Sequence, residues 1–111
     1  MMNSQELETA VRLKLNLVVL ILNDSSYGMI RWKQAGMGFN DWGLEYGNPD
    51  FSLYAQSYGV TPHEIQEHNS LPMVIDDAFD SGGVHLIDLP VDYSDNVKNL
   101  ISDLAEHEPV I

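Results

Sequence analysis

Apolar residues near the N-terminus recur at helical spacing and are followed directly by an unbroken apolar run. The spacing predicts an amphipathic helix from Ser4 to Lys14, with Ser4 as its cap. The run at 15–22, LNLVVLIL, is typical of a parallel strand that is buried on both faces. A helix that leads into a buried strand indicates an α/β fold.

The segment after this strand is rich in turn formers and glycine. A short helix is predicted at 27–34, and an irregular loop at 35–47 is expected to pack its own aromatic residues Phe39, Trp42 and Tyr46. The segment follows the carboxyl end of a strand, which is the edge where open α/β sheets bind ligands. We therefore expect the chemistry of this chain at this position.

The remaining sequence repeats the order of helix, turn and strand. Asn48 is expected to cap a helix that ends at Gly59. The further predicted elements are a short strand at 60–62, a helix from a cap at Asn69 or Ser70 to about Asp80, a strand at 84–91 and a helix at 94–106. These elements predict a three-layer α/β/α fold with a parallel sheet.

Charge and amino-acid composition limit the kinds of molecule that this chain is expected to bind. Five Lys and Arg against seventeen Asp and Glu give a net charge of −12, which repels nucleic acids and anionic membranes. The chain has no cysteine, so disulfides and thiolate chemistry are excluded. The longest apolar run is far shorter than the roughly 20 residues that span a bilayer, and the N-terminus lacks the features of a signal peptide. We expect a cytoplasmic protein with neither nucleic-acid nor membrane partners.

The four histidines offer no obvious metal site. His63, His68, His85 and His107 are scattered, and no two have the i, i+4 spacing of a helical metal site. They are therefore expected to be surface or satisfied core histidines.

The string LNDSSYGMIRWKQ at 22–34 resembles the second half of the thiamine diphosphate (ThDP) motif of the acetolactate synthase family. That motif opens with Gly-Asp-Gly and closes, after a helix and a strand, with Asn-Asn or Asn-Asp. The strings MNSQELETAVRLKLNLVVLILND, YGNPDFSLYAQSYG and GVHLIDLPVDYSDN are similar to other parts of the same family. The resemblance covers nearly the whole chain. It implies that 1–111 is the C-terminal part of a ThDP-binding domain, starting just after a missing Gly-Asp-Gly.

The resemblance also implies which residues meet the cofactor. Asp24 would supply a side-chain oxygen and Ser26 a backbone carbonyl to Mg²⁺, a cation that prefers oxygen ligands. Met29 and Ile30 would form an apolar wall beside the thiazolium and the substrate. The complete implied cofactor-binding set is Asn23, Asp24, Ser25, Ser26, Tyr27, Gly28, Met29 and Ile30.

Other interpretations of these residues remain open. For Asn23 and Tyr27, the resemblance implies only that they shape the cofactor loop. Taken without the resemblance, Asp24 is a turn residue or a helix cap, because its carboxylate can accept from backbone N–H groups. Met29 and Ile30 are then core residues.

The family's enzymes decarboxylate one 2-oxo acid, such as pyruvate, and join it to a second. In them a separate domain supplies the glutamate that activates the cofactor, and no residue of this chain can replace it. We therefore assign no catalytic residue, and expect ThDP and Mg²⁺ to bind this fragment weakly or not at all. The preference for the acceptor 2-oxo acid, which the family tunes near Trp32 and Lys33, stays undetermined.

Two alternative functions are considered beside this interpretation. One is the small subunit of a two-chain ThDP-dependent 2-oxo acid decarboxylase, and the other is a noncatalytic oligomerising module. A parallel sheet without its first strands would expose an edge and an apolar face. A homo-oligomer is therefore expected.

Overall fold

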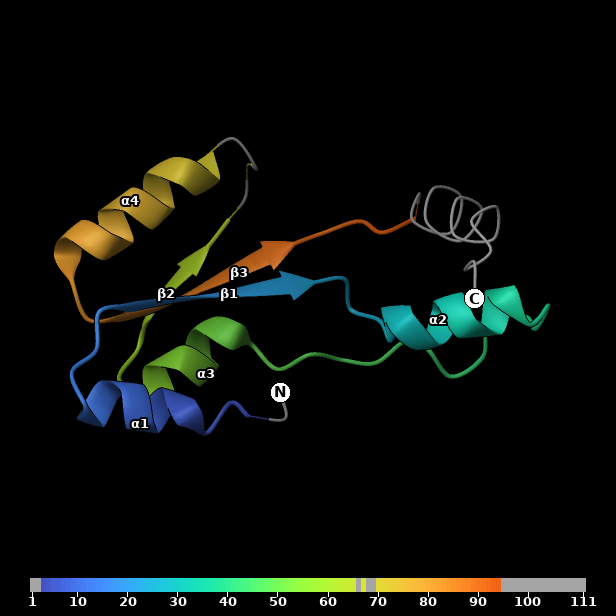
Figure 1. The fold of residues 1–111 in the computed structure, drawn as a ribbon, viewed down its shortest axis with the longest axis horizontal. Coiled ribbons are helices and arrows are strands. Elements are labelled where there is room, and N and C mark those ends of the chain that lie inside the picture. The colour runs from blue at the N-terminus through green and yellow to red at the C-terminus, as the bar shows by residue number, and fades with distance from the viewer. Residues whose placement is uncertain (1–2, 66, 68–69, 95–111) are drawn as a thin grey trace, which may run out of the picture. The chain divides into compact units, whose positions relative to one another are not determined.

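The computed structural model describes residues 3–65, 67 and 70–94 (Figure 1). These residues form two compact units, one of 3–23 with 48–90 and one of 24–47 with 91–94. The elements are α1 (Glu6–Arg12), β1 (Leu17–Asn23), α2 (Gly28–Gly36), α3 (Phe51–Ser57), β2 (Thr61–Glu64), α4 (Leu71–Ser81) and β3 (Val84–Pro90). Only α2 belongs to the second unit. None of the helices in these residues is long and apolar enough to cross a membrane.

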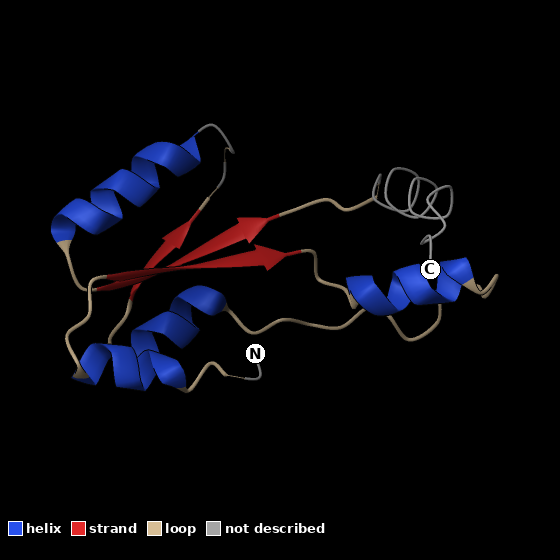
Figure 2. Cartoon of the chain, in the orientation of Figure 1, coloured by secondary structure: helices blue, strands red, loops and turns tan. Residues whose placement is uncertain are grey.

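The three strands of the first unit form one parallel sheet in the order β1-β3-β2. In the register, Leu20 lies beside Ile87, and Pro62 lies beside Leu86. Helices α1 and α3 lie on one side of the sheet, and α4 lies on the other (Figures 1 and 2). This arrangement confirms the predicted three-layer α/β/α fold with a parallel sheet.

The core is built around β3, whose side chains alternate between the two faces of the sheet. Val84 and Leu86 join a buried cluster with residues of α1 and α3. His85 and Ile87 point to the opposite face, where α4 contributes the fully buried Ala78. The cluster on the first face consists of Leu7, Ala10, Phe51, Ala55, Val60, Val84 and Leu86.

Strand β1 is not the buried strand that its sequence predicts. Leu17, Leu20 and Leu22 keep 36%, 41% and 52% of their surface exposed. The reason is the position of β1 at the edge of the described sheet, where only β3 pairs with it. Four of the first five residues of β3, by contrast, are buried. An apolar run shows that a strand can be buried and does not show which strand becomes central.

The predicted cap of the first helix is wrong. The helix begins at Glu6, and Gln5 occupies the cap position without a side-chain hydrogen bond. The hydroxyl of Ser4 instead accepts a hydrogen bond of 2.6 Å from the Tyr54 hydroxyl. Ser4 thus links the N-terminal segment to α3.

Helix α3 also has a different cap from the one predicted. Asp50, rather than Asn48, accepts from the backbone N–H of Leu53 at 2.8 Å. The side chain of Asn48 reaches back to Asn23. Gly59 follows the helix with φ +76°, a conformation that favours glycine, so the predicted end of this helix is confirmed.

The other predicted elements are found within a few residues of their expected bounds. Ser70 is at the N-cap position of α4, although its hydroxyl donates to the Glu67 carbonyl rather than to the helix. Pro72 lies in the first turn, as predicted. Asn69 and nearly all of the helix predicted at 94–106 lie outside the described residues.

Candidate functional site

Asn23, the last residue of β1, is held by its side chain to two other segments of the first unit. Its Nδ2 donates to Oδ1 of Asp88 on β3 at 3.1 Å. Its Oδ1 accepts from Nδ2 of Asn48 at 2.6 Å. These bonds fix the carboxyl end of β1 against β3 and against the segment that precedes α3.

The next three residues form a tight turn in the second unit. Oδ1 of Asp24 accepts from the backbone N–H of Ser26 at 3.1 Å. Ser25 has φ +52°, a left-handed conformation that costs a non-glycine residue about 1–3 kcal/mol. Asp24 is therefore a turn residue and not the cap of α2, whose cap position is Tyr27 without a side-chain bond. The carboxylate has a second oxygen, so this turn is compatible with a metal ligand at Asp24.

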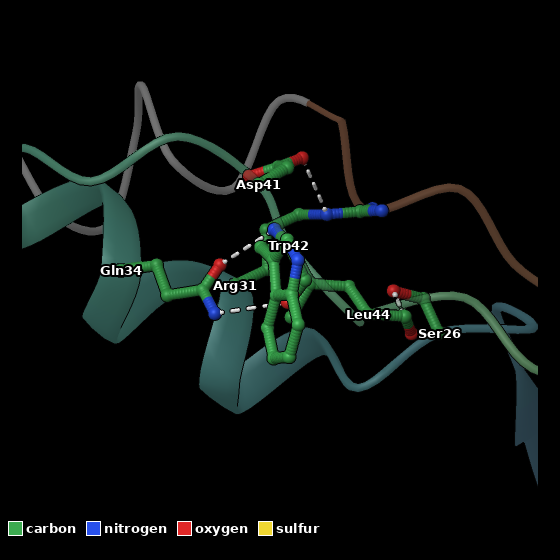
Figure 3. Close-up of polar contacts among 6 residues, drawn as sticks. All are labelled: Ser26, Arg31, Gln34, Asp41, Trp42 and Leu44. Atoms are coloured by element: carbon green, nitrogen blue, oxygen red, sulfur yellow. Dashed lines mark hydrogen bonds and ion pairs between the residues drawn. The ribbon is translucent and has the colours of Figure 1, made fainter.

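Ser26 and Tyr27 are held by the loop at 44–46, which runs beside them in the second unit. The Ser26 hydroxyl donates to the Leu44 carbonyl at 3.4 Å (Figure 3), and only 7% of Ser26 is exposed. The backbone N–H of Tyr27 donates to the same carbonyl at 3.0 Å. The rings of Tyr27 and Tyr46 lie 4.4 Å apart between centroids. The backbone of the implied cofactor loop is thus well supported.

The start of α2 lies close to the carboxylate of Asp24. A Cβ on Gly28 would come within 3.1 Å of Asp24 Oδ2, so glycine leaves the space that this carboxylate occupies. Met29 and Ile30 are 64% and 48% exposed. In the described structure they are not core residues, and their apolar surface is available for contact with another molecule.

The loop after α2 is held by polar contacts, and of its three aromatic rings only that of Tyr46 has a ring partner in the described residues. The side-chain amide of Gln34 donates to the Trp42 carbonyl and accepts from the Trp42 N–H, both at 3.2 Å (Figure 3). Arg31 Nε lies 3.2 Å from Asp41 Oδ2 as an ion pair. Phe39 and Trp42 remain 63% and 83% exposed, so their predicted packing is wrong.

A hollow of about 280 Å³ lies in the second unit between α2 and this loop. It is lined by Arg31, Asp41, Trp42, Gly43, Leu44 and Glu45. Apart from the packing expected of Trp42, the sequence pattern predicted no role for these residues. The one available sign was a cation, Arg31, close to a glycine-rich loop that carries Asp41 and Glu45.

The described residues contain no group of three or more His, Asp or Glu side chains that could hold a metal ion. A cation at Asp24 would therefore depend on backbone oxygens and on the oxygens of a ligand. Carboxylate and carbonyl oxygens are the donors that Mg²⁺ prefers, and Mg²⁺ commonly binds through one or two carboxylates plus substrate phosphates. The residues thus fit Mg²⁺ in chemical type.

Comparison with known proteins assigns the chain to a family. Residues 1–89 match the family model described as thiamine pyrophosphate enzyme, C-terminal TPP binding domain. Thiamine pyrophosphate is another name for ThDP.

Several acetolactate synthases are similar to the chain over most of its length. An acetolactate synthase of Bacillus subtilis (strain 168) is 39% identical over 106 residues, which are 96% of this chain and 18% of that protein. A catabolic acetolactate synthase of Raoultella terrigena is 34% identical, over 85% of the chain and 17% of the relative. The large subunit of isozyme 2 from Escherichia coli (strain K12) is 30% identical, over the whole chain and 21% of the relative. The chain thus spans about a fifth of the length of these relatives.

Proposed function

The chain belongs to the family of C-terminal TPP-binding domains of thiamine pyrophosphate enzymes, and from this premise we propose that it works as part of an acetolactate-synthase-like enzyme. Such an enzyme decarboxylates a 2-oxo acid and joins the product to a second 2-oxo acid. Similarity to acetolactate synthases over most of the chain supports the reaction. The part proposed for 1–111 is to hold the diphosphate end of the cofactor.

The observation that carries the proposal is the turn at 24–26. It presents the Asp24 carboxylate directly after a parallel strand, the edge where α/β sheets bind ligands. Asp24 and the Ser26 carbonyl would be the protein ligands of Mg²⁺. When bound, ThDP supplies the electron sink for decarboxylation and carboligation. The proposed cofactor-binding residues are Asn23, Asp24, Ser25, Ser26, Tyr27, Gly28, Met29 and Ile30.

The other residues of the set have supporting roles in this proposal. Asn23 fixes the strand end, and Tyr27 fixes the loop through its backbone and its ring. Gly28 leaves room for the Asp24 carboxylate. Met29 and Ile30 offer apolar surface to the thiazolium or the substrate and help to exclude water there.

The Asp24→Ala variant is expected to lose magnesium-dependent binding of ThDP. Binding to the chain is expected to be weak, so ¹H–¹⁵N spectra titrated with ThDP, with and without Mg²⁺, are the suitable measurement. Without the carboxylate, the apparent affinity should fall by about tenfold or more, because even the loss of an outer-shell partner of a metal ligand typically costs about that much.

Asp92→Ala is the matched control for this experiment. Oδ1 of Asp92 accepts from the Ser94 N–H at 2.8 Å, which is the same type of turn. That bond also lowers the pKa of Asp92. The control should bind like the wild type. Equal losses in both variants, or shifts of the same size without Mg²⁺, would contradict the proposed role of Asp24.

A second variant, Gly28→Ala, separates binding from folding. The helix preference of alanine, up to about 1 kcal/mol in helix interiors, acts against the cost of moving the Asp24 carboxylate, so the variant should stay close to the wild type in stability. Its methyl group should displace the Asp24 carboxylate and weaken magnesium-dependent binding. Unchanged binding would place the cation away from this carboxylate.

We also propose that the chain associates with further copies of itself. The support is the exposed leucines of β1, an apolar strand that pairs on one side only in the described sheet. Light scattering should give a mass of at least two chains. A stable monomer at all accessible concentrations would refute the association.

A further inference from the structure

Two histidines that are far apart in the sequence form a hydrogen-bonded pair in the first unit. Nε2 of His63 on β2 lies 2.9 Å from Nδ1 of His85 on β3. The rings are stacked, with centroids 5.2 Å apart and an interplanar angle of 27°. His85 is only 3% exposed, whereas His63 is partly buried. The pair therefore connects an edge strand of the described sheet to its central strand.

The second nitrogen of His85 shows where its proton lies. Nε2 is 3.0 Å from the Gly82 carbonyl, which can only accept, so Nε2 carries the hydrogen. Nε2 is also 3.3 Å from the Ser81 hydroxyl, whose own hydrogen points to the Asp77 carbonyl at 2.8 Å. Ser81 is therefore an acceptor as well. Neutral His85 must then accept at Nδ1, and His63 must donate from Nε2.

This arrangement has room for only one additional proton. Protonation of His63 at Nδ1 leaves its Nε2–H bond to His85 in place. A second proton would have to enter on Nδ1 of His85, where it would face the N–H of His63. The hydrogen bond would then be lost, and two cations would lie side by side next to a buried face of the sheet.

We propose that the His63–His85 pair is an acid-sensitive link between β2 and β3, which stays closed while at most one extra proton is bound and opens when both rings are charged. The pair shares no residue with the proposed cofactor site. The role of these histidines is to hold β2 on the sheet.

The surroundings of the pair act on its protonation in both directions. Burial, followed by the adjacent His85, lowers the pKa of His63, and Asp77 on α4 acts in the opposite direction. The strands and α4 contain no Lys or Arg. Their other carboxylates are Asp76 and Asp80 on α4, Glu64 on β2 and Asp88 on β3. Glu64 accepts from Ser52, and Asp88 accepts from Asn23.

The direction of the pH effect follows from proton counting. The unfolded chain protonates both imidazoles as the pH falls through about 6.5. The folded chain with a closed link takes up at least one proton fewer. The stability contribution of the link is therefore fully present above about pH 6.5 and is lost progressively as the pH falls below it, and the lowered pKa of His63 adds to this loss. The folding equilibrium constant should fall about tenfold per pH unit for each excluded proton.

The test is urea denaturation of the full chain at several pH values between 7.5 and 5.5. The wild type should lose stability across this range. His63→Gln should show a much shallower loss, because an amide can donate to neutral His85 or, after turning over, accept from charged His85. Ser81→Ala is the control and should keep the wild-type slope, because the Gly82 carbonyl still fixes the tautomer. Equal slopes in wild type and His63→Gln would overturn the proposal.

Nitrogen NMR of the histidine-labelled wild type gives a second test that needs no variant to fold. At pH 7.5, His85 should show a protonated Nε2 and an unprotonated Nδ1, and His63 should carry hydrogen on Nε2. A hydrogen on Nδ1 of His85 at this pH would also overturn the proposal.

Discussion

Replacing Phe51 with alanine should lower the free energy of unfolding by about 3–5 kcal/mol. Phe51 is the first residue of α3, is only 6% exposed and belongs to the cluster that joins α1 and α3 to β3. The loss combines the transfer free energy of the ring with the cost of the cavity. It is a large part of the roughly 5–15 kcal/mol that stabilises a typical domain.

Leu53→Ala is the matched control on the same helix. Leu53 is 63% exposed, so its loss should change stability by no more than about 0.5 kcal/mol. Urea denaturation should be followed by far-UV circular dichroism, because both tryptophans, Trp32 and Trp42, lie in the second unit. Similar losses for Phe51→Ala and Leu53→Ala would show that α3 does not pack on the sheet as described.

Ile87→Ala should cost about 2–5 kcal/mol on the opposite face of the sheet. Ile87 lies on the central strand β3 and is fully buried. Leu20 is its partner in the register on β1 and is 41% exposed. The same truncation at Leu20 should therefore cost less than about 1 kcal/mol.

The comparison of Ile87→Ala with Leu20→Ala measures which strand is central. The two residues are both apolar and lie side by side. A difference between the two losses of stability therefore reflects their burial and not their side-chain chemistry. A larger loss at Leu20 than at Ile87 would place β1, rather than β3, at the centre of the packed structure. It would also remove the exposed leucines on which the proposed association depends.

Much of the candidate site followed from the sequence because its residues are neighbours in the chain. The turn at 24–26 and the helix that begins at Gly28 form through short-range contacts. Such contacts depend on residue type and spacing, which a sequence displays directly. The contacts that Leu44 and Tyr46 make with Ser26 and Tyr27 were not predictable in this way. They depend on how the loop at 35–47 folds back against the turn.

Two misassigned residues illustrate the same limit within the first unit. Ser4 and Asn48 are both good cap residues by type, yet their side chains bond to Tyr54 and Asn23. Each partner belongs to another element and becomes available only when the elements pack. A rule based on local sequence weighs a capping hydrogen bond only against hydrogen bonds to water. It cannot include a competing hydrogen-bond partner on another element.

The sequence by itself determined the order of helices and strands, the parallel sheet, the family and the turn that carries Asp24. Hydrophobic period, turn chemistry and a contiguous motif encode these features locally. Only the tertiary structure decided that β3 is central and β1 an edge, and that His63 meets His85 across neighbouring strands. Those outcomes depend on which apolar surfaces bury one another. That choice is made by the free energy of the packed chain as a whole, since many segments of similar hydrophobicity compete for the same partners.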